Sequence, residues 1–329
     1  MIKKIKLTGE NKKELATLEE KFKHACLQRD IPRAQKYLKK IQDLLRPLGQ
    51  HVRLSQNKCL YCELLVNTGY EENAIPLLLG LRKLLNANTR IYLEATVLLA
   101  ISYLRRDNLM AAEPLMSEVL QNDTVIRSDF QRQNFQRIVM NRFNEESVLT
   151  TLRQSIGSSE LLDPVEIQTQ AGCYVYQYNE DELYEKIGEN TPKPVKDILL
   201  KVERFSQKQL PCQDVKFLPS PERFKQNRET GKVVGTAIKK TLHHALCNPE
   251  CETHKIFITD GFSGVLKTFT IGSAVSTCFS NLGIGLAALA IPVAAFIFKV
   301  GLDTFCELYP VDSIMETRKV RKRNTSTTK

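Results

Sequence analysis

The feature that most restricts the fold of this 329-residue chain is an uncharged apolar run near its C-terminal end. Between Lys267 and Lys299 lie 31 residues, Thr268 to Phe298, without a charged side chain. A helix needs about 20 apolar residues to cross the roughly 30 Å hydrocarbon core of a bilayer, so the run is long enough for one crossing. Because apolar surface is driven out of water, the run predicts either membrane contact or a buried core.

The flanks of this run favour membrane contact. Its many small residues suit close helix packing in lipid and in a soluble core almost equally. The basic tail "ETRKVRKRNTSTTK" is expected to stay on the cytoplasmic side or to lie on anionic lipid, so that the run re-enters or lies in the interface as a hairpin. The alternative is two core helices of a soluble C-terminal domain, with Lys299 and Asp303 as an i,i+4 pair.

The N-terminal third of the chain repeats a helical pattern. Three segments align on Ala34, Ala74 and Ala112, which are 40 and 38 residues apart, and each contains an apolar helix, a short polar turn and a second helix. In the second helix, apolar residues four and seven positions after the alanine form one stripe, and the alanine allows close helix contact. The stripe residues are Leu38, Ile41, Leu78, Leu81, Met116 and Val119.

This pattern resembles the tetratricopeptide repeat family over roughly residues 14 to 122, and the third unit matches best. Its Tyr103, Ala112, Met116 and Val119 fall where that family places aromatic, small and large apolar residues. The first two units lack the aromatic residue and have longer connections than a repeat of about 34 residues. The resemblance implies a right-handed stack of helical hairpins whose concave face binds a peptide or a helix. An ordinary helical bundle is the alternative.

These patterns predict a mostly α fold with five segments. They are a helical-hairpin solenoid (1–125), a helical extension (126–208), a Pro-rich linker (209–230), a separate C-terminal module with the apolar helix or helical hairpin (231–310) and a basic tail (311–329). The extension contains predicted helices at 127–154 and 195–205, and the alternating "CYVYQY" at 173–178 predicts one short strand. The prolines of the linker stand among polar residues, which is typical of a domain boundary.

The stretch "LHHALCNPECETH" holds the densest group of metal-binding side chains. His244, Cys247, Cys251 and His254 offer two imidazoles and two thiolates within eleven residues, which is the chemistry of a tetrahedral zinc site. Their spacing is not typical of such a site. It favours the alternative, a helix C-terminus where His243 and His244 meet the helix dipole and Cys247 packs into the core. Zinc is the one cofactor that the sequence suggests, and no other is expected.

The sequence contains no catalytic fingerprint. The nine cysteines are odd in number and scattered, which predicts mostly reduced, buried thiols, and the CxxC pair Cys59 and Cys62 is interpreted as core. The stretch "RETGKVVGT" lacks the first glycine and the hydroxyl residue of a phosphate loop, and "DGFSG" is not a nucleophile elbow. We therefore expect a protein that is not an enzyme.

Charge indicates the kind of partner. The net charge of +10 favours anionic partners, and the chain has no basic patch with interleaved aromatic residues, so anionic lipid is preferred over nucleic acid. The start "MIKKIKLTGENKKE" has no apolar core of signal-peptide length, which predicts the cytoplasmic side. We expect a module that binds a protein or peptide through its repeats and is membrane-associated through the apolar run. The alternative is a wholly soluble adaptor or regulator in which that run is core.

Overall fold

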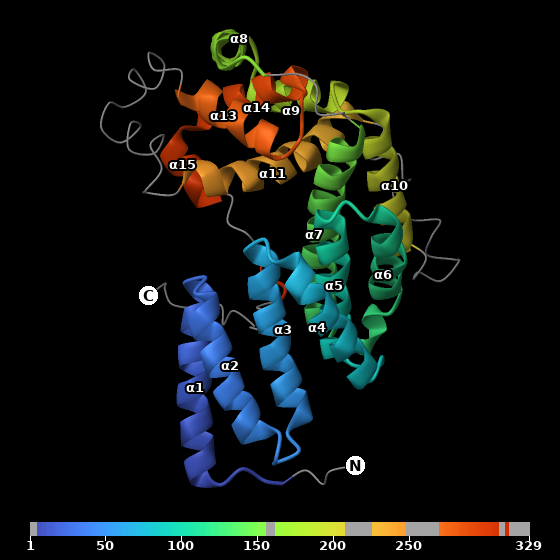
Figure 1. The fold of residues 1–329 in the computed structure, drawn as a ribbon. Helices are drawn as coiled ribbons and strands as arrows, with labels where there is room; N and C mark the ends of the chain where they lie inside the picture. Colours follow the sequence, from blue (N-terminus) through green and yellow to red (C-terminus); the bar gives the residue numbers. More distant parts are fainter. Residues whose placement is uncertain (1–4, 156–161, 208–225, 248–269, 309–312, 316–329) are drawn as a thin grey trace, which may run out of the picture. The chain divides into compact units, whose positions relative to one another are not determined.

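The computed structural model describes residues 5–155, 162–207, 226–247, 270–308 and 313–315 (Figure 1). These residues form α-helices and one 3-10 helix, and they contain no strand, which confirms the mostly α fold class. The chain divides into two compact units. Unit 1 comprises residues 1–139 and 313–329, and unit 2 comprises residues 140–312. The boundary between them falls within helix α7 (Asp129–Ser155).

Unit 1 contains three consecutive helical hairpins, coloured blue to green in Figure 1. The first helices of successive hairpins contact one another, α1 with α3 and α3 with α5, in addition to their own partners. A 3-10 helix (Asp123–Val125) and the start of α7 follow. The hairpins are α1 (Gly9–Leu27) with α2 (Ile31–Leu45), α3 (His51–Asn67) with α4 (Glu71–Leu84), and α5 (Arg90–Arg105) with α6 (Leu109–Gln121).

The three hairpin turns share one backbone geometry. Arg29, Gly69 and Asp107 each stand five residues before an aligned alanine and have positive φ angles of 56°, 82° and 54°. Glycine adopts this left-handed conformation readily, whereas other residues meet a steric penalty of about 1–2 kcal/mol. In each turn, the residue after the one with positive φ donates its N–H to the carbonyl of the residue five positions earlier. This is the 6→1 hydrogen bond of a Schellman motif. These bonds are Asp30 to Ala25 at 3.0 Å, Tyr70 to Leu65 at 2.8 Å and Asn108 to Tyr103 at 2.9 Å.

The predicted stripe of the second helices faces the core. Ala34, Ala74 and Ala112 are all 0% exposed. Five of the six stripe residues are at most 4% exposed, and Leu38 is half-buried. The apolar periodicity therefore predicted the correct inner face of each helix.

Charged side chains join neighbouring hairpins. Arg53 of α3 donates to both carboxylate oxygens of Glu19 in α1, at 2.8 and 2.7 Å, and Asn57 donates to the same group at 3.0 Å. Burial alone raises the pKa of Glu19, but the hydrogen bonds and the charge of Arg53 outweigh burial and leave the pKa below its ordinary value. The Arg82 guanidinium of α4 lies 2.6 Å from the Glu118 carboxylate of α6. This ion pair links the second hairpin to the third.

Unit 2 encloses a second apolar core. Helix α14 contacts α8 and α9, α11 packs along α9, and α13 contacts α8. The helices after α7 are α8 (Pro164–Gln177), α9 (Glu180–Glu189), α10 (Lys193–Gln207), α11 (Asn227–Leu246), α13 (Thr270–Asn281), α14 (Ala287–Val300) and α15 (Leu302–Leu308).

Most of the apolar run lies in helices α13 and α14 of this core. Every residue from Leu289 to Phe298 is buried. At the end of α14, the Lys299 ammonium donates to the carbonyls of Val175 (3.2 Å) and Tyr178 (2.7 Å) at the C-terminus of α8, and the Asp303 side chain lies outside the described residues. None of the described helices is both long enough and apolar enough to cross a bilayer.

Glycines allow α9 and α11 to approach closely. A Cβ atom at Gly231 of α11 would lie 1.7 Å from the backbone oxygen of Tyr184 in α9. A Cβ atom at Gly188 of α9 would lie 1.8 Å from the backbone oxygen of Asn227. Both distances are far below van der Waals contact, so this helix pair requires glycine at both positions.

The predicted strand at 173–178 is wrong, because these residues form the end of α8 and its C-cap. Asp163 caps the N-terminus of this helix, because its side chain accepts from the Val165 N–H at 2.9 Å, and Pro164 occupies the first turn. Tyr174, Val175 and Tyr178 pack against the core of unit 2, and this tertiary packing overrides their β-propensity. The helices predicted at 127–154 and 195–205 are confirmed as α7 and α10.

The predicted linker at 209–230 falls mostly on residues 208–225, which lie outside the described residues. Its last positions form the first turn of α11. The helices before and after it, α10 and α11, both belong to unit 2.

Candidate functional site

A buried carboxylate in unit 1 binds a distant segment of the chain. Glu63 of α3 stands in an otherwise apolar stretch and is 4% exposed. Its oxygens accept from the Ser313 hydroxyl at 2.8 Å and from the Ile314 N–H at 2.5 Å. The Met315 N–H lies 3.4 Å from both oxygens. Because a buried charge is costly without hydrogen bonds, these donors are needed to keep the carboxylate inside the protein.

The bound segment presents its backbone to Glu63. Two successive backbone N–H groups converging on one anion form the arrangement known as a nest. In unit 1 the anion is the Glu63 carboxylate of α3, and the N–H groups of the nest belong to the segment Ser313–Met315. The Ile314 side chain is 1% exposed, so the segment is anchored by apolar burial as well as by hydrogen bonds.

The negative charge of Glu63 also acts on a thiol of helix α1. Burial raises the pKa of the Cys26 thiol, near the end of α1, to about 12, and the negative charge of Glu63 adds to the increase. We call Glu63 and the groups that bind Ser313–Met315 the Glu63 site.

A shallow hollow of about 350 Å³ lies on the hairpin of α1 and α2. Lys21, His24 and Arg33 line it beside Glu20 and Tyr37. The surrounding residues 5–53 carry 12 Lys and Arg against 6 Asp and Glu, so much of the positive charge of the chain is concentrated on this hairpin and its flanks. This surface suits acidic side chains of a partner.

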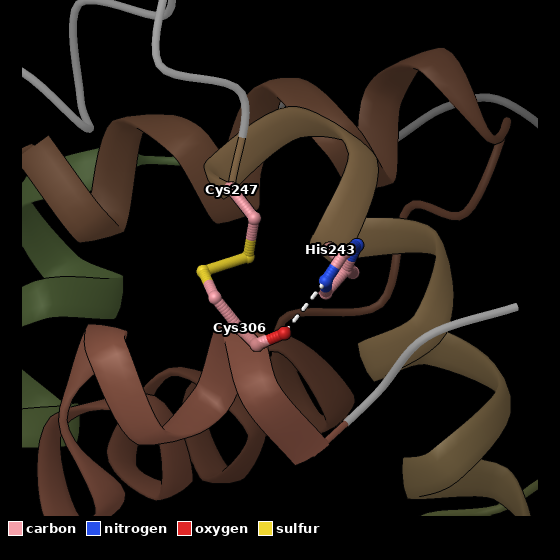
Figure 2. Close-up of a disulfide and its surroundings, with 3 residues drawn as sticks. All are labelled: His243, Cys247 and Cys306. Carbon is pink, nitrogen blue, oxygen red and sulfur yellow. Dashed lines mark hydrogen bonds between the residues drawn. A yellow bond between two sulfur atoms is a disulfide. The ribbon is translucent and has the colours of Figure 1, made fainter. Parts of the chain in front are cut away.

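The structure places Cys247 in a disulfide instead of among the predicted metal ligands. Figure 2 shows the bond to Cys306, with sulfurs 2.02 Å apart and Cα atoms 5.5 Å apart. The His243 Nε2 atom lies 3.0 Å from the Cys306 carbonyl oxygen, so α11 and α15 are joined by a covalent and a polar contact (Figure 2). The expectation of mostly reduced cysteines did not include this pair, and five other described cysteines are not in disulfides.

The zinc prediction at His244, Cys247, Cys251 and His254 stays a prediction. The His244 side chain and the residues Cys251 and His254 lie outside the described part of the structure. A disulfide sulfur is not a thiolate ligand, so zinc would need Cys247 in its reduced form. Within the described ranges, no group of three or more His, Cys, Asp or Glu side chains is arranged to hold a metal ion.

We expect the disulfide to stabilise the protein by about 4 kcal/mol, because it closes a loop with a sequence separation of 59 residues. A thermal melt with and without dithiothreitol measures this, using wild type and a double variant with Cys247→Ala and Cys306→Ala. Reductant should lower the melting temperature of wild type and leave the double variant unchanged. Equal melting of oxidised wild type and the double variant would contradict the prediction.

Cys59 and Cys62 are core residues, as predicted. Both are 0% exposed, and burial raises the pKa of Cys62 to about 12. A thiol with such a pKa is almost entirely protonated at neutral pH, so Cys62 is a poor nucleophile.

A lysine side chain is buried in unit 2. Lys239 of α11 is 0% exposed, its Nζ atom lies 2.8 Å from the Tyr184 hydroxyl, and it stands 3.0 Å from the centre of the Phe296 ring. Burial lowers the pKa of this amine to about 6, against a smaller opposite effect of Glu180. The amine is therefore mostly neutral at pH 7, which is the form of a nucleophile. Since it is enclosed by aromatic rings, a substrate does not reach it in this conformation.

Neither Glu63 nor Lys239 was predicted from the sequence. Glu63 interrupts the apolar stretch Cys59–Val66, and a lone acid inside an apolar helix is a signal for a buried partner. Lys239 follows Gly231 and Gly235 at intervals of four residues, which places it on the buried face of its helix. Neither signal could have identified the partner, which for Glu63 is 251 residues away.

The chain matches no protein-family model, and comparisons with curated proteins and with solved structures likewise find no match.

Proposed function

We propose that unit 1 is a protein-interaction module that binds a short segment or a helix of a partner protein. One observation supports this most strongly: the Glu63 site holds a chain segment through the backbone of that segment. Backbone contacts give affinity for segments of varied sequence, and neighbouring pockets add specificity. Such a role requires no catalytic group.

We further propose that the hairpins of unit 1 form a stack like that of tetratricopeptide repeats. The positive φ angle shared by the three turns supports this, as do the contacts between the first helices of successive hairpins. The ion pair between Arg53 and Glu19 links the first hairpin to the second, and the ion pair between Arg82 and Glu118 links the second to the third. Stacked hairpins present a continuous face to a partner, and the Glu63 site would lie on it.

For the apolar run we propose a role as core of unit 2. The burial of Leu289–Phe298 among helices of this unit supports the core alternative over membrane contact. An uncharged helix whose side chains are used in packing has no apolar face left for lipid. Membrane association on the cytoplasmic side stays a prediction that rests on the basic tail.

Vesicle flotation tests this role. The full chain is mixed with phosphatidylcholine vesicles that either contain or lack phosphatidylserine. We expect any binding to require phosphatidylserine and to be lost in high salt, because only surface charge attracts the chain to lipid. The variant Val293→Lys, at a residue that is 0% exposed, should unfold unit 2. Salt-resistant flotation, together with a folded Val293→Lys variant, would show that the run inserts into the bilayer.

Selection from a displayed peptide library tests the interaction function. The full chain is the bait, and the Glu63→Lys variant serves for counter-selection, because it replaces the acceptor by a cation that repels N–H donors. We expect enriched peptides that bind wild type and fail to bind the variant. The proposed function would be wrong if no peptide were enriched, or if all enriched peptides bound independently of unit 1 substitutions.

A further inference from the structure

We propose that the Glu63 site recognises a turn in which a hydroxyl residue precedes a large aliphatic residue, and that Ser313–Met315 of this chain is its resident occupant. A partner segment of the same chemistry would have to displace it. This inference rests on the proposed peptide-binding function and adds the chemistry of the segment and its competition with the chain itself.

The hydroxyl requirement follows from the acceptor. An ionised carboxylate has only acceptor sites, so each group that it contacts has to be a donor. The Ser313 hydroxyl supplies one donor at 2.8 Å. An alanine at this position would remove this donor from the carboxylate. An aspartate or a phosphorylated serine would place a second negative charge against Glu63 and would repel it.

The aliphatic requirement follows from burial. The Ile314 side chain is 1% exposed while its N–H donates to the Glu63 carboxylate at 2.5 Å. A polar side chain at this position would lose water without gaining a partner. The site therefore combines a hydrogen-bonded backbone with one apolar side chain, and the buried aliphatic residue selects among segments whose backbones are alike.

Covalent connection makes the resident segment a strong competitor. A tethered ligand binds at an effective concentration set by its tether, on the order of millimolar for a flexible connection. An external segment of equal intrinsic affinity would compete poorly in wild type. It would bind well once Ser313–Met315 has been released.

Fluorescence anisotropy with a labelled peptide tests the inference. The probe is "YPVDSIMETRK", the sequence of residues 309–319, titrated with the full chain. We expect the Ile314→Asp chain to bind it at least about tenfold more tightly than wild type, because its own segment no longer occupies the site. The same peptide with Asp in place of Ser should not bind. Circular dichroism checks that the variant is folded, and Ser313→Asp serves as a second releasing variant.

Matched variants show where the peptide binds. Adding Glu63→Ala to Ile314→Asp should weaken binding by about tenfold or more, since it removes a charged acceptor. Adding Glu14→Ala, which changes an exposed carboxylate on α1, should leave binding unchanged. Equal binding by wild type and both releasing variants, or binding that does not depend on Glu63, would overturn the inference. If the library selection still yields other Glu63-dependent peptides, the interaction function stands and only the proposed motif is discarded.

Discussion

Gly231→Ala is expected to destabilise unit 2 by more than about 4 kcal/mol, a loss of stability that few single substitutions cause. The new Cβ atom would lie 1.7 Å from the Tyr184 oxygen and 2.9 Å from the Gly188 nitrogen. Both neighbours are backbone atoms of α9, so a change of side-chain rotamer cannot relieve the overlap. Helix α9 would have to move away from α11, which would also disturb its contact with α14.

Urea denaturation followed by circular dichroism measures the loss, and Gly80→Ala is the matched control. Gly80 lies inside α4 of unit 1, and a Cβ atom there would meet no heavy atom within 4 Å. Because alanine is favoured over glycine in a helix interior by about 1 kcal/mol, Gly80→Ala should stabilise the protein. An unchanged stability of Gly231→Ala would mean that α9 and α11 do not pack as closely as described.

Lys239→Met is expected to stabilise the protein by about 3 kcal/mol at pH 7, because the buried amine must lose its proton for the chain to fold. The pKa of Lys239 falls from an ordinary 10.5 to about 6, and burial is the main cause. Between these two values the unfolded chain holds a proton that the folded chain lacks. The hydrogen bond to Tyr184 is lost in the variant, which offsets part of the gain.

The sign of the pH dependence follows from this difference. Stability of wild type falls as the pH is lowered from 10.5 toward 6, since protons bind the unfolded chain preferentially. Below pH 6 both states hold the proton, and the penalty stays constant. The full penalty is on the order of 6 kcal/mol. The stability difference between Lys239→Met and wild type should therefore grow as the pH falls through this range.

Urea denaturation at several pH values between 6 and 10 measures the effect, and Lys240→Met is the neighbouring control. The Lys240 ammonium lies 2.6 Å from the Glu145 carboxylate, which is largely buried. Removing this cation should destabilise the protein, because Glu145 loses its closest ion pair. Equal destabilisation by both substitutions, or an unchanged pH slope in Lys239→Met, would show that the Lys239 amine folds in its charged form.

Periodic patterns were enough to predict the helical hairpins of unit 1. The spacing from Ala74 to Leu78 and Leu81 defines one face, and a helix must bury that face whatever the rest of the chain does. The turn at Gly69 was predictable for the same reason, because its chemistry is local. The strand predicted at 173–178 failed because β-propensity is weak and the packing partner, α14, follows more than a hundred residues later.

The contacts that define the candidate site could not be predicted from local patterns. Glu63 and Ile314 are 251 residues apart, and the sequence between them gives no sign that they meet. Cys247 and Cys306 belong to a set of nine cysteines, for which spacing alone allows many pairings. The apolar run left core and membrane open because hydrophobicity drives burial in either environment, and the surrounding helices decide between them.

Amide hydrogen exchange at Ile314 tests most directly whether unit 1 holds a chain segment at Glu63. The Ile314 N–H donates to the carboxylate and its side chain is buried, so its exchange requires release of the segment. We predict exchange at least about tenfold slower in wild type and in Glu14→Ala than in Glu63→Ala. Equally rapid exchange in all three proteins would contradict the Glu63 site.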